Sequence, residues 1–264
     1  MDITQTITLA LIQGLTEFLP VSSSAHLVVL PKFLEWPDQG LAFDVVLHFA
    51  TLCAIIFYYR YSLVSLTKDF YDSIATRKTQ GESMLAWGII LGTIPVGIVG
   101  LLFRESIELN LRSYQVVAFA TIFFGLLLGF SEWLHRTLNK SREYISGSDI
   151  LIVGCFQALA LIPGTSRSGI TITAALLIGL SRALSIKYAF LLSIPVIALA
   201  TLLKTFDLVK DKNQVDWSLL FIGFIVALIT SYFTIFFFIR LVERIGFLPF
   251  VIYRILLGAL LFLL

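Results

Sequence analysis

The segment from residue 13 to 26 places polar side chains inside an apolar stretch. Glu17 is a carboxylate within this stretch, and Gln13 precedes it by one helical turn on the same face. A carboxylate at the centre of a membrane helix costs roughly 2.5–3.5 kcal/mol, so such a residue usually serves a function. Pro20 interrupts the segment. The polar residues after this break are Ser22, Ser23, Ser24 and His26.

These residue types suit proton transfer and nucleophilic attack. A carboxylate beside a hydroxyl can accept its proton as the oxygen attacks. We expect Ser23 to be the nucleophile and Glu17 the base, with His26 three residues beyond Ser23 on the same side of a helix. Two alternatives stay open: His26 is itself the nucleophile, or Glu17 activates a water molecule. His48, without polar neighbours in the sequence, and His135, at a loop, are expected to be structural.

A second apolar segment, residues 149–180, contains residues suited to binding a phosphate. It is interrupted at Pro163-Gly164 and contains Arg167, whose guanidinium can hold a phosphate through two hydrogen bonds. Both breaks are followed by helix-capping residues, so two helix N-termini would present free main-chain N–H groups that attract anions. The expected phosphate-binding residues are Gln13, Ser22, Ser24, Gly164, Thr165, Ser166, Ser168 and Gly169. If either turn is considered alone, the alternative to phosphate binding is that its residues only cap the half-helices and that Arg167 extends to a lipid headgroup.

The composition identifies an integral membrane protein. Of 264 residues, 58% are hydrophobic and only 14% are charged, and the net charge is +2. A soluble protein has nearer to 25% charged residues, so this chain lacks the polar groups to coat a globule. The same figures exclude a disordered chain, a disulfide scaffold and a nucleic-acid-binding protein.

Hydropathy predicts an all-α membrane protein with a single polytopic domain. Six stretches are long enough to cross a bilayer: 43–59, 87–103, 114–134, 184–204, 217–239 and 248–264. In the interrupted segments, 3–34 and 149–180, the helix on either side of the break is too short to cross a bilayer. A broken backbone at membrane depth is tolerated only where it is buried in protein or lines a watery cavity. We therefore expect two re-entrant helical hairpins.

The two interrupted segments resemble each other, which predicts an internal repeat. QGLTEFLPVSSS begins at Gln13 and QALALIPGTSRS begins at Gln157. Each segment precedes three spans, so the halves, about 1–146 and 147–264, would have opposite topologies and place their site near the midplane. The loops at 60–86, 135–148, 181–187 and 240–247 are richer in Lys and Arg than those on the other face, which predicts that they are cytoplasmic. Gly125 and Gly129 would allow close helix contact, within one chain or in a homodimer.

QGLTEFLPVSSSAH and PGTSRSG resemble the two signature segments of the undecaprenyl-diphosphate phosphatases, the bacitracin-resistance phosphatases of bacterial inner membranes. The resemblance covers essentially the whole chain. It implies hydrolysis of a long-chain isoprenyl diphosphate, undecaprenyl diphosphate, to the monophosphate carrier that is recycled for cell-wall synthesis. It also implies a multi-pass protein of the inner membrane with its site open to the periplasm.

The resemblance further implies a divalent cation, with Mg²⁺ expected and Ca²⁺ as the alternative. The family's Glu/Gln-x-x-x-Glu pattern falls on Gln13 and Glu17, its serine cluster on Ser22 to Ser24, its histidine on His26, and its arginine on Arg167. Because the first position is an amide, Glu17 would bind the metal together with phosphates and water, or would act as a base oriented by Gln13.

Two other functions fit parts of the pattern. A polyprenyl-phosphate transporter or flippase would also use inverted repeats and broken helices. The other type of membrane lipid phosphatase needs two histidines, and no histidine follows the second interrupted segment. The buried Glu and Arg argue against a purely structural scaffold.

Overall fold

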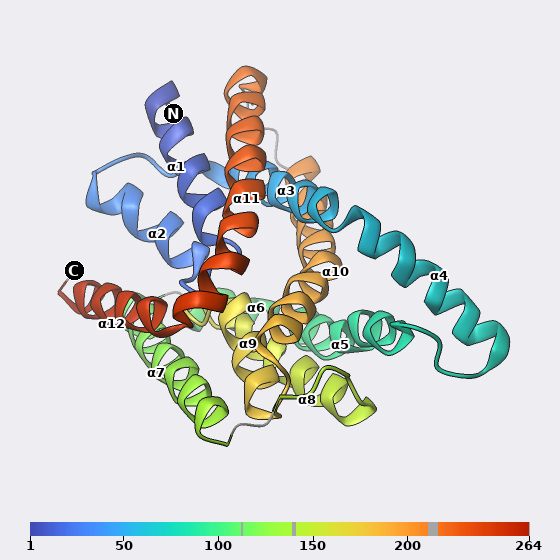
Figure 1. Ribbon diagram of the computed structural model, residues 1–264. Coiled ribbons are helices and arrows are strands. Elements are labelled where there is room, and N and C mark those ends of the chain that lie inside the picture. Colours follow the sequence, from blue (N-terminus) through green and yellow to red (C-terminus); the bar gives the residue numbers. More distant parts are fainter. Residues whose placement is uncertain (112, 139–140, 211–215, 264) are drawn as a thin grey trace.

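The structure, a computed structural model, describes residues 1–111, 113–138, 141–210 and 216–263, and within these ranges the secondary structure is helical apart from one isolated β-bridge. Figure 1 shows the helices crossing at steep angles around a common centre. In chain order they are α1 (Ile3–Thr16), α2 (Ser23–Phe33), α3 (Gly40–Tyr58), α4 (Arg60–Thr76), α5 (Ser83–Leu102), α6 (Arg104–Asn110), α7 (Tyr114–Leu138), α8 (Gly147–Ala158), the 3-10 turn η1 (Leu159–Leu161), α9 (Arg167–Leu177), α10 (Arg182–Lys210), α11 (Trp217–Ile245) and α12 (Leu248–Phe262).

Five helices are long and apolar enough to cross a membrane, namely α3, α5, α7, α10 and α11. They coincide with the first five predicted spans, and many of their large apolar side chains point outward, as expected for helices that face lipid. The sixth predicted span, 248–264, is also an apolar helix, but α12 has only 15 residues. The chain is a multi-pass membrane protein.

Both interrupted segments are broken helices, as the sequence predicts. The first is α1, which ends at Thr16, and α2, which begins at Ser23; the second is α8 with η1, followed after residues 162–166 by α9. None of these pieces exceeds 15 residues, whereas a helix that crosses a bilayer needs about 20. The breaks lie between the long helices at the centre of the molecule.

The helix packing follows a regular pattern. The first half of each broken segment packs along a long helix of the other half of the chain: α1 against α11, and α8 against α5. At the centre, α7 packs against α12 and α3 against α10. Gly125 lies against Arg254 of α12, and Gly129 lies against Val251 of the same helix. These two glycines therefore serve a contact within one chain.

The long polar stretch at 60–86 is not simply a loop, because it contains α4. In Figure 1, α4 leads away from the end of α3 and returns through a turn to α5. Leu66 is buried, and Phe70 packs against Trp87 of α5, with ring centroids 4.8 Å apart. The outer face exposes Tyr61 and Val64. Residues 139–140, in the predicted loop 135–148, and residues 211–215 lie outside the described residues.

A salt bridge fixes the ends of the second broken segment. Arg142 donates to both carboxylate oxygens of Asp149, near the start of α8, at 2.9 and 3.0 Å. It also donates to the carbonyl of Ile178, just after α9, at 2.8 Å. One guanidinium thus ties the beginning of α8 to the end of α9. The beginning of α8 and the end of α9 therefore lie close together.

Candidate active site

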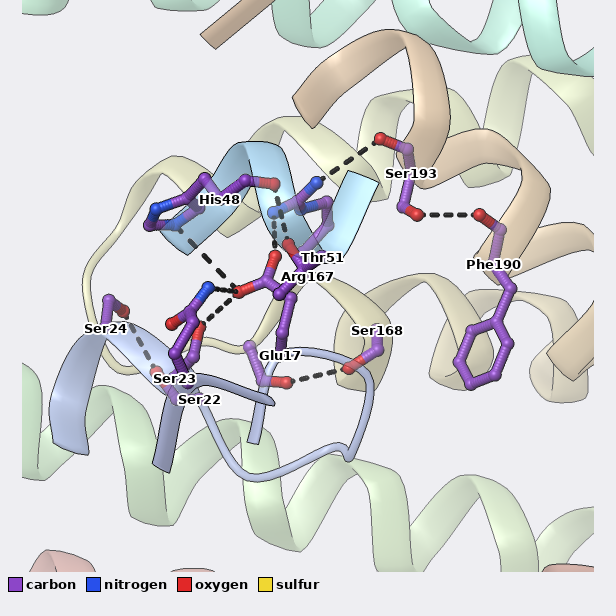
Figure 2. Close-up of polar contacts among 12 residues, drawn as sticks. Glu17, Ser22, Ser23, Ser24, His48, Thr51, Arg167, Ser168, Phe190 and Ser193 are labelled. Atoms are coloured by element: carbon purple, nitrogen blue, oxygen red, sulfur yellow. Dashed lines mark hydrogen bonds and ion pairs between the residues drawn. The ribbon is translucent and has the colours of Figure 1, made fainter. Parts of the chain in front are cut away.

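Glu17 lies at the centre of the site, directly after α1. Its Oε1 accepts a hydrogen bond from Arg167 Nη2 at 2.6 Å, and its Oε2 accepts from Ser23 Oγ at 2.6 Å and from Gln13 Nε2 at 3.0 Å. Figure 2 shows these side chains converging on the carboxylate from both broken segments. The Glu17 side chain is 3% exposed and that of Arg167 is 20% exposed. The two turns therefore meet, and their polar side chains form one site.

The turns share an unusual backbone geometry. Ser22 precedes α2 with φ 70° and ψ 92°, and Ser166 precedes α9 with φ 67° and ψ 114°. Non-glycine residues rarely adopt such positive φ values, and each costs of order 1–3 kcal/mol unless the surroundings enforce it. Strain of this kind often occurs at functional sites. Here it turns the next side chain in each segment, Ser23 or Arg167, toward Glu17.

The two serine pairs correspond as well. The hydroxyl of Ser22 lies 3.1 Å from that of Ser24, and the hydroxyl of Ser166 lies 3.2 Å from that of Ser168. Ser168 also donates to the carbonyl of Leu19 in the other turn at 3.0 Å. Ser24 is exposed, whereas both serines of the second turn are buried. Ser166 and Ser168 thus contribute to the turn and its docking.

Main-chain amides at both helix starts are available to a ligand. Within the described residues, no acceptor takes the N–H groups of Ser23, Ser24, Arg167 or Ser168. The next amide, that of Gly169, is already satisfied by Ser166 Oγ at 3.2 Å. Two helix N-termini close together, each with free N–H groups, form an anion-binding site.

Gly164 and Thr165 occupy the tightest part of the second turn. Gly164 has φ +93°, and a Cβ there would collide with the carbonyl of Val117, so no larger residue fits. Its carbonyl accepts from Arg254 Nη2 at 2.9 Å. Thr165 is fully buried, and its hydroxyl has no partner among the described residues. Gly164 therefore has a conformational role in the turn.

Arg254 of α12 joins the two turns from behind. It is completely buried, and its guanidinium donates to the carbonyls of Gly164 at 2.9 Å and Pro20 at 3.4 Å. It also donates to the carbonyl of Thr121 at 3.0 Å. Within the described ranges no carboxylate pairs with it. Arg254 was not among the predicted site residues, although a charge in the middle of an apolar helix is the same signal that identified Glu17.

Two histidines lie beside the first turn. His26 Nδ1 donates to the Ser22 carbonyl at 2.7 Å, and Nε2 accepts from the Tyr253 hydroxyl at 2.6 Å, so its ring is held at the edge of the site. His48, expected to be structural, has its Nε2 3.9 Å from Glu17 Oε2. His48 therefore has a polar neighbour, which the spacing along the sequence could not show because Glu17 belongs to another segment of the chain.

The oxygen atoms around Glu17 fit a divalent cation. Gln13 Oε1 is buried and has no partner among the described residues, while its amide group orients Glu17. Carboxylate and amide oxygens are hard ligands that Mg²⁺ and Ca²⁺ prefer. No cluster of three or more His, Cys, Asp or Glu side chains occurs among the described residues, so a metal here would need further ligands from phosphate and water.

Comparison with known proteins agrees with the motifs. The family model described as "Bacitracin resistance protein BacA" matches residues 6–260. The chain belongs to the BacA family. A protein of Ruthia magnifica subsp. Calyptogena magnifica, named undecaprenyl-diphosphatase, is 57% identical over 99% of this chain and 98% of its own length. Another, named undecaprenyl-diphosphatase 2, from Stutzerimonas stutzeri (strain A1501), is 54% identical over 100% of this chain and 98% of its own.

Membership of the BacA family confirms the resemblance that the two sequence motifs suggested. In this BacA chain, both motifs lie at the breaks and face each other. Glu17 contacts both Ser23 and Arg167, and the remaining predicted residues surround them in the two turns or hold the turns in shape. The roles of the individual residues are proposals that follow from this geometry.

Arg254 offers a test of how the BacA site is held together. We expect Arg254→Met to destabilise the protein by about 3 kcal/mol, because carbonyls of both turns lose their buried, charged donor. The detergent-solubilised variant should melt roughly 6–12 °C below the wild type. Arg77→Met, an exposed position at the end of α4, is the control and should leave the melting temperature unchanged. Equal melting temperatures for the wild type and Arg254→Met would contradict this role.

Proposed function

We propose that this chain hydrolyses undecaprenyl diphosphate to undecaprenyl phosphate and inorganic phosphate, and so recycles the lipid carrier for cell-wall synthesis. The full-length relatives that bear the name undecaprenyl-diphosphatase support this activity. The observation that carries the proposal is the contact of Glu17 with both Ser23 and Arg167. It places a base, a hydroxyl nucleophile and a phosphate-binding cation within hydrogen-bond distance.

The diphosphate binds between the two turns. The free N–H groups at the starts of α2 and α9 and the guanidinium of Arg167 hold the phosphoryl oxygens, and they oppose the charge that develops during transfer. Only Nη2 of the Arg167 guanidinium contacts Glu17. Nη1 makes a long contact of 3.4 Å with the Ser193 carbonyl, so Nη1 and Nε can still bind the substrate. The isoprenyl chain extends into lipid between the helices.

Ser23 attacks the terminal phosphorus as Glu17 accepts its proton. The bond between this phosphorus and the bridging oxygen breaks, and undecaprenyl phosphate leaves with the electron pair. Glu17 passes its proton to solvent and then accepts a proton from the water that attacks the phosphoserine. The bond between phosphorus and Ser23 Oγ breaks, Ser23 takes this proton back, and inorganic phosphate is released. His48 lies close enough to Glu17 to stabilise its charge, while His26 positions the Ser22 turn through its hydrogen bond.

A divalent cation, Mg²⁺ or Ca²⁺, would be held by Glu17 and Gln13 Oε1. When bound, it would neutralise phosphate charge and help to orient the diphosphate. The orphan amide oxygen of Gln13 supports this assignment.

For the architecture, we propose six membrane-spanning helices, including α12, and two re-entrant hairpins, in inverted repeats of about 1–146 and 147–264. The matching contacts of α1 with α11 and of α8 with α5 support the repeat, as do the matching strained serines Ser22 and Ser166. The distribution of Lys and Arg supports an orientation with the Lys- and Arg-rich loops in the cytoplasm. From the likeness to the inner-membrane phosphatases, we place the chain in the inner membrane with its site open to the periplasm.

Phosphate release distinguishes hydrolysis from transport. The purified protein in detergent, given a long isoprenyl diphosphate labelled in its terminal phosphate and Mg²⁺, should release labelled phosphate. A transporter would release none. The short hydrogen bond from Ser23 to Glu17 favours hydrolysis, because carrying a lipid across a membrane does not require an activated hydroxyl.

We expect the label to be trapped on Ser23. Quenching in SDS at neutral pH during turnover, which preserves both phosphoserine and phosphohistidine, followed by peptide mapping, should recover phosphoserine at position 23, and Ser23→Ala should carry no label. His26→Gln is the matched comparison and should still be labelled on Ser23. Label on His26 in the wild type would assign the nucleophile to the histidine. Turnover without any labelled protein under conditions that trap such intermediates would favour direct attack by water.

A further inference from the structure

A groove with a volume of about 790 Å³ runs along the outside of the helices α1, α11 and α12. It is distinct from the site at Glu17 and lies on a helix long and apolar enough to cross the membrane. Its apolar wall includes Leu15, Phe233, Phe237 and Leu241, which are exposed at the surface of the molecule. The volume is within the range of about 300–1,000 Å³ that is common for ligand sites.

Two arginines near the C-terminal end of α11 also line this groove. Arg240 and Arg244 are four residues apart, so their side chains lie one above the other on the same helix face. Both are exposed, and among the described residues neither has a carboxylate partner. The guanidinium of Arg240 lies over the ring of Phe236 at 3.9 Å, which leaves its N–H edge free. Glu243 lies between them in sequence but does not line the groove.

We propose that this groove binds an anionic phospholipid. Its phosphate pairs with Arg240 and Arg244, and one acyl chain lies along the apolar wall formed by Phe237 and Leu241. Both parts of the groove support this occupant. The adjacent pair of guanidiniums suits a phosphate, and the apolar wall suits a hydrocarbon chain. A soluble phosphate would not contact the apolar wall of the groove, and an apolar helix of another protein would leave Arg240 and Arg244 without an anionic partner.

The position of the groove connects it with the first turn. Leu15 belongs to α1, and Leu19 lies in the turn two residues after Glu17. The carbonyl of Leu19 accepts the hydrogen bond from Ser168 that joins the turns. A lipid in the groove therefore packs against the outer side of the first broken segment, and its binding should stabilise the folded protein.

Native mass spectrometry of the detergent-solubilised protein tests this site. Palmitoyl-oleoyl phosphatidylglycerol should bind in preference to phosphatidylcholine with the same acyl chains and should raise the melting temperature. The double variant Arg240→Gln/Arg244→Gln should bind phosphatidylglycerol about 30-fold more weakly, as expected for the loss of two basic residues at a lipid headgroup. Arg240→Lys/Arg244→Lys should retain most of the binding, since the charge is kept.

Matched controls separate this site from general surface charge. Arg77→Gln/Lys78→Gln removes the same charge from exposed positions outside the groove and should bind like the wild type. sn-Glycerol 3-phosphate, which offers the phosphate without acyl chains, should neither bind nor stabilise. Equal losses in the two double-glutamine variants, equal binding of both lipids, or stabilisation by glycerol phosphate would each overturn the proposal.

Discussion

Replacing Arg167 by glutamine is expected to slow phosphate release by about 10³–10⁵-fold, the range found when a transition-state arginine is lost from phosphoryl-transfer enzymes. Arg167 is the cation that reaches Glu17 from the second turn, at 2.6 Å. Its loss removes both a phosphate ligand and the partner of a buried carboxylate. The measurement is the initial rate of phosphate release from a long isoprenyl diphosphate by purified protein.

The conservative variant shows which property of Arg167 matters. Arg167→Lys keeps the positive charge but loses the planar fork, so we expect it to remain well below the wild-type rate. Arg77→Gln removes a guanidinium from the exposed end of α4 and should have the wild-type rate. Near-normal turnover by Arg167→Gln, with the fold intact, would place the phosphate-binding site elsewhere.

Replacing Glu17 by glutamine should lower turnover by about 10²–10⁴-fold, the usual contribution of a positioned general base. The amide has nearly the same shape, but it cannot accept the proton of Ser23, which now donates to Glu17 Oε2 at 2.6 Å. It also leaves Arg167 without a carboxylate partner. The loss should appear in kcat, because the step that suffers is proton transfer during attack.

Two further measurements distinguish a catalytic base from a structural carboxylate. The pH dependence of kcat in the wild type should show a requirement for a deprotonated group, and Glu17→Gln should lose that limb of the profile. Glu243→Gln neutralises an exposed carboxylate on α11 and should change neither the rate nor the profile. A Glu17→Gln variant with the wild-type pH profile would show that another group takes the proton.

The two breaks and the long apolar helices could be predicted from the sequence because their signals are local. A proline within an apolar stretch, followed by serines or by Gly-Thr-Ser-Arg, identifies a broken helix with a polar turn, and both breaks occur where they were expected. The hydropathy of α3, α5, α7, α10 and α11 likewise depends on neighbouring residues alone. That the two breaks would share one site followed from the expected inverted repeat, which places its site near the midplane.

What the sequence did not reveal depends on packing between distant segments. His48 reaches Glu17 only because α3 passes beside the first turn, and no spacing along the chain encodes that approach. The helix α4 was missed because its buried side, with Leu66, is narrow and most of its surface is polar or exposed. Arg254 could have been found from its place within an apolar helix, but its partners are main-chain carbonyls, which carry no sequence signal.

The guanidinium of Arg254 has a consequence for substrate and product. Glu17 offsets the charge of Arg167, but within the described chain no acidic group offsets Arg254, which lies behind both turns. The region between the turns therefore has a surplus of positive potential in a medium that screens it poorly. A headgroup with two phosphates gains more from that potential than one with a single phosphate, so the reaction itself weakens the hold on the lipid. We expect this difference to help the monophosphate leave and the next diphosphate to take its place.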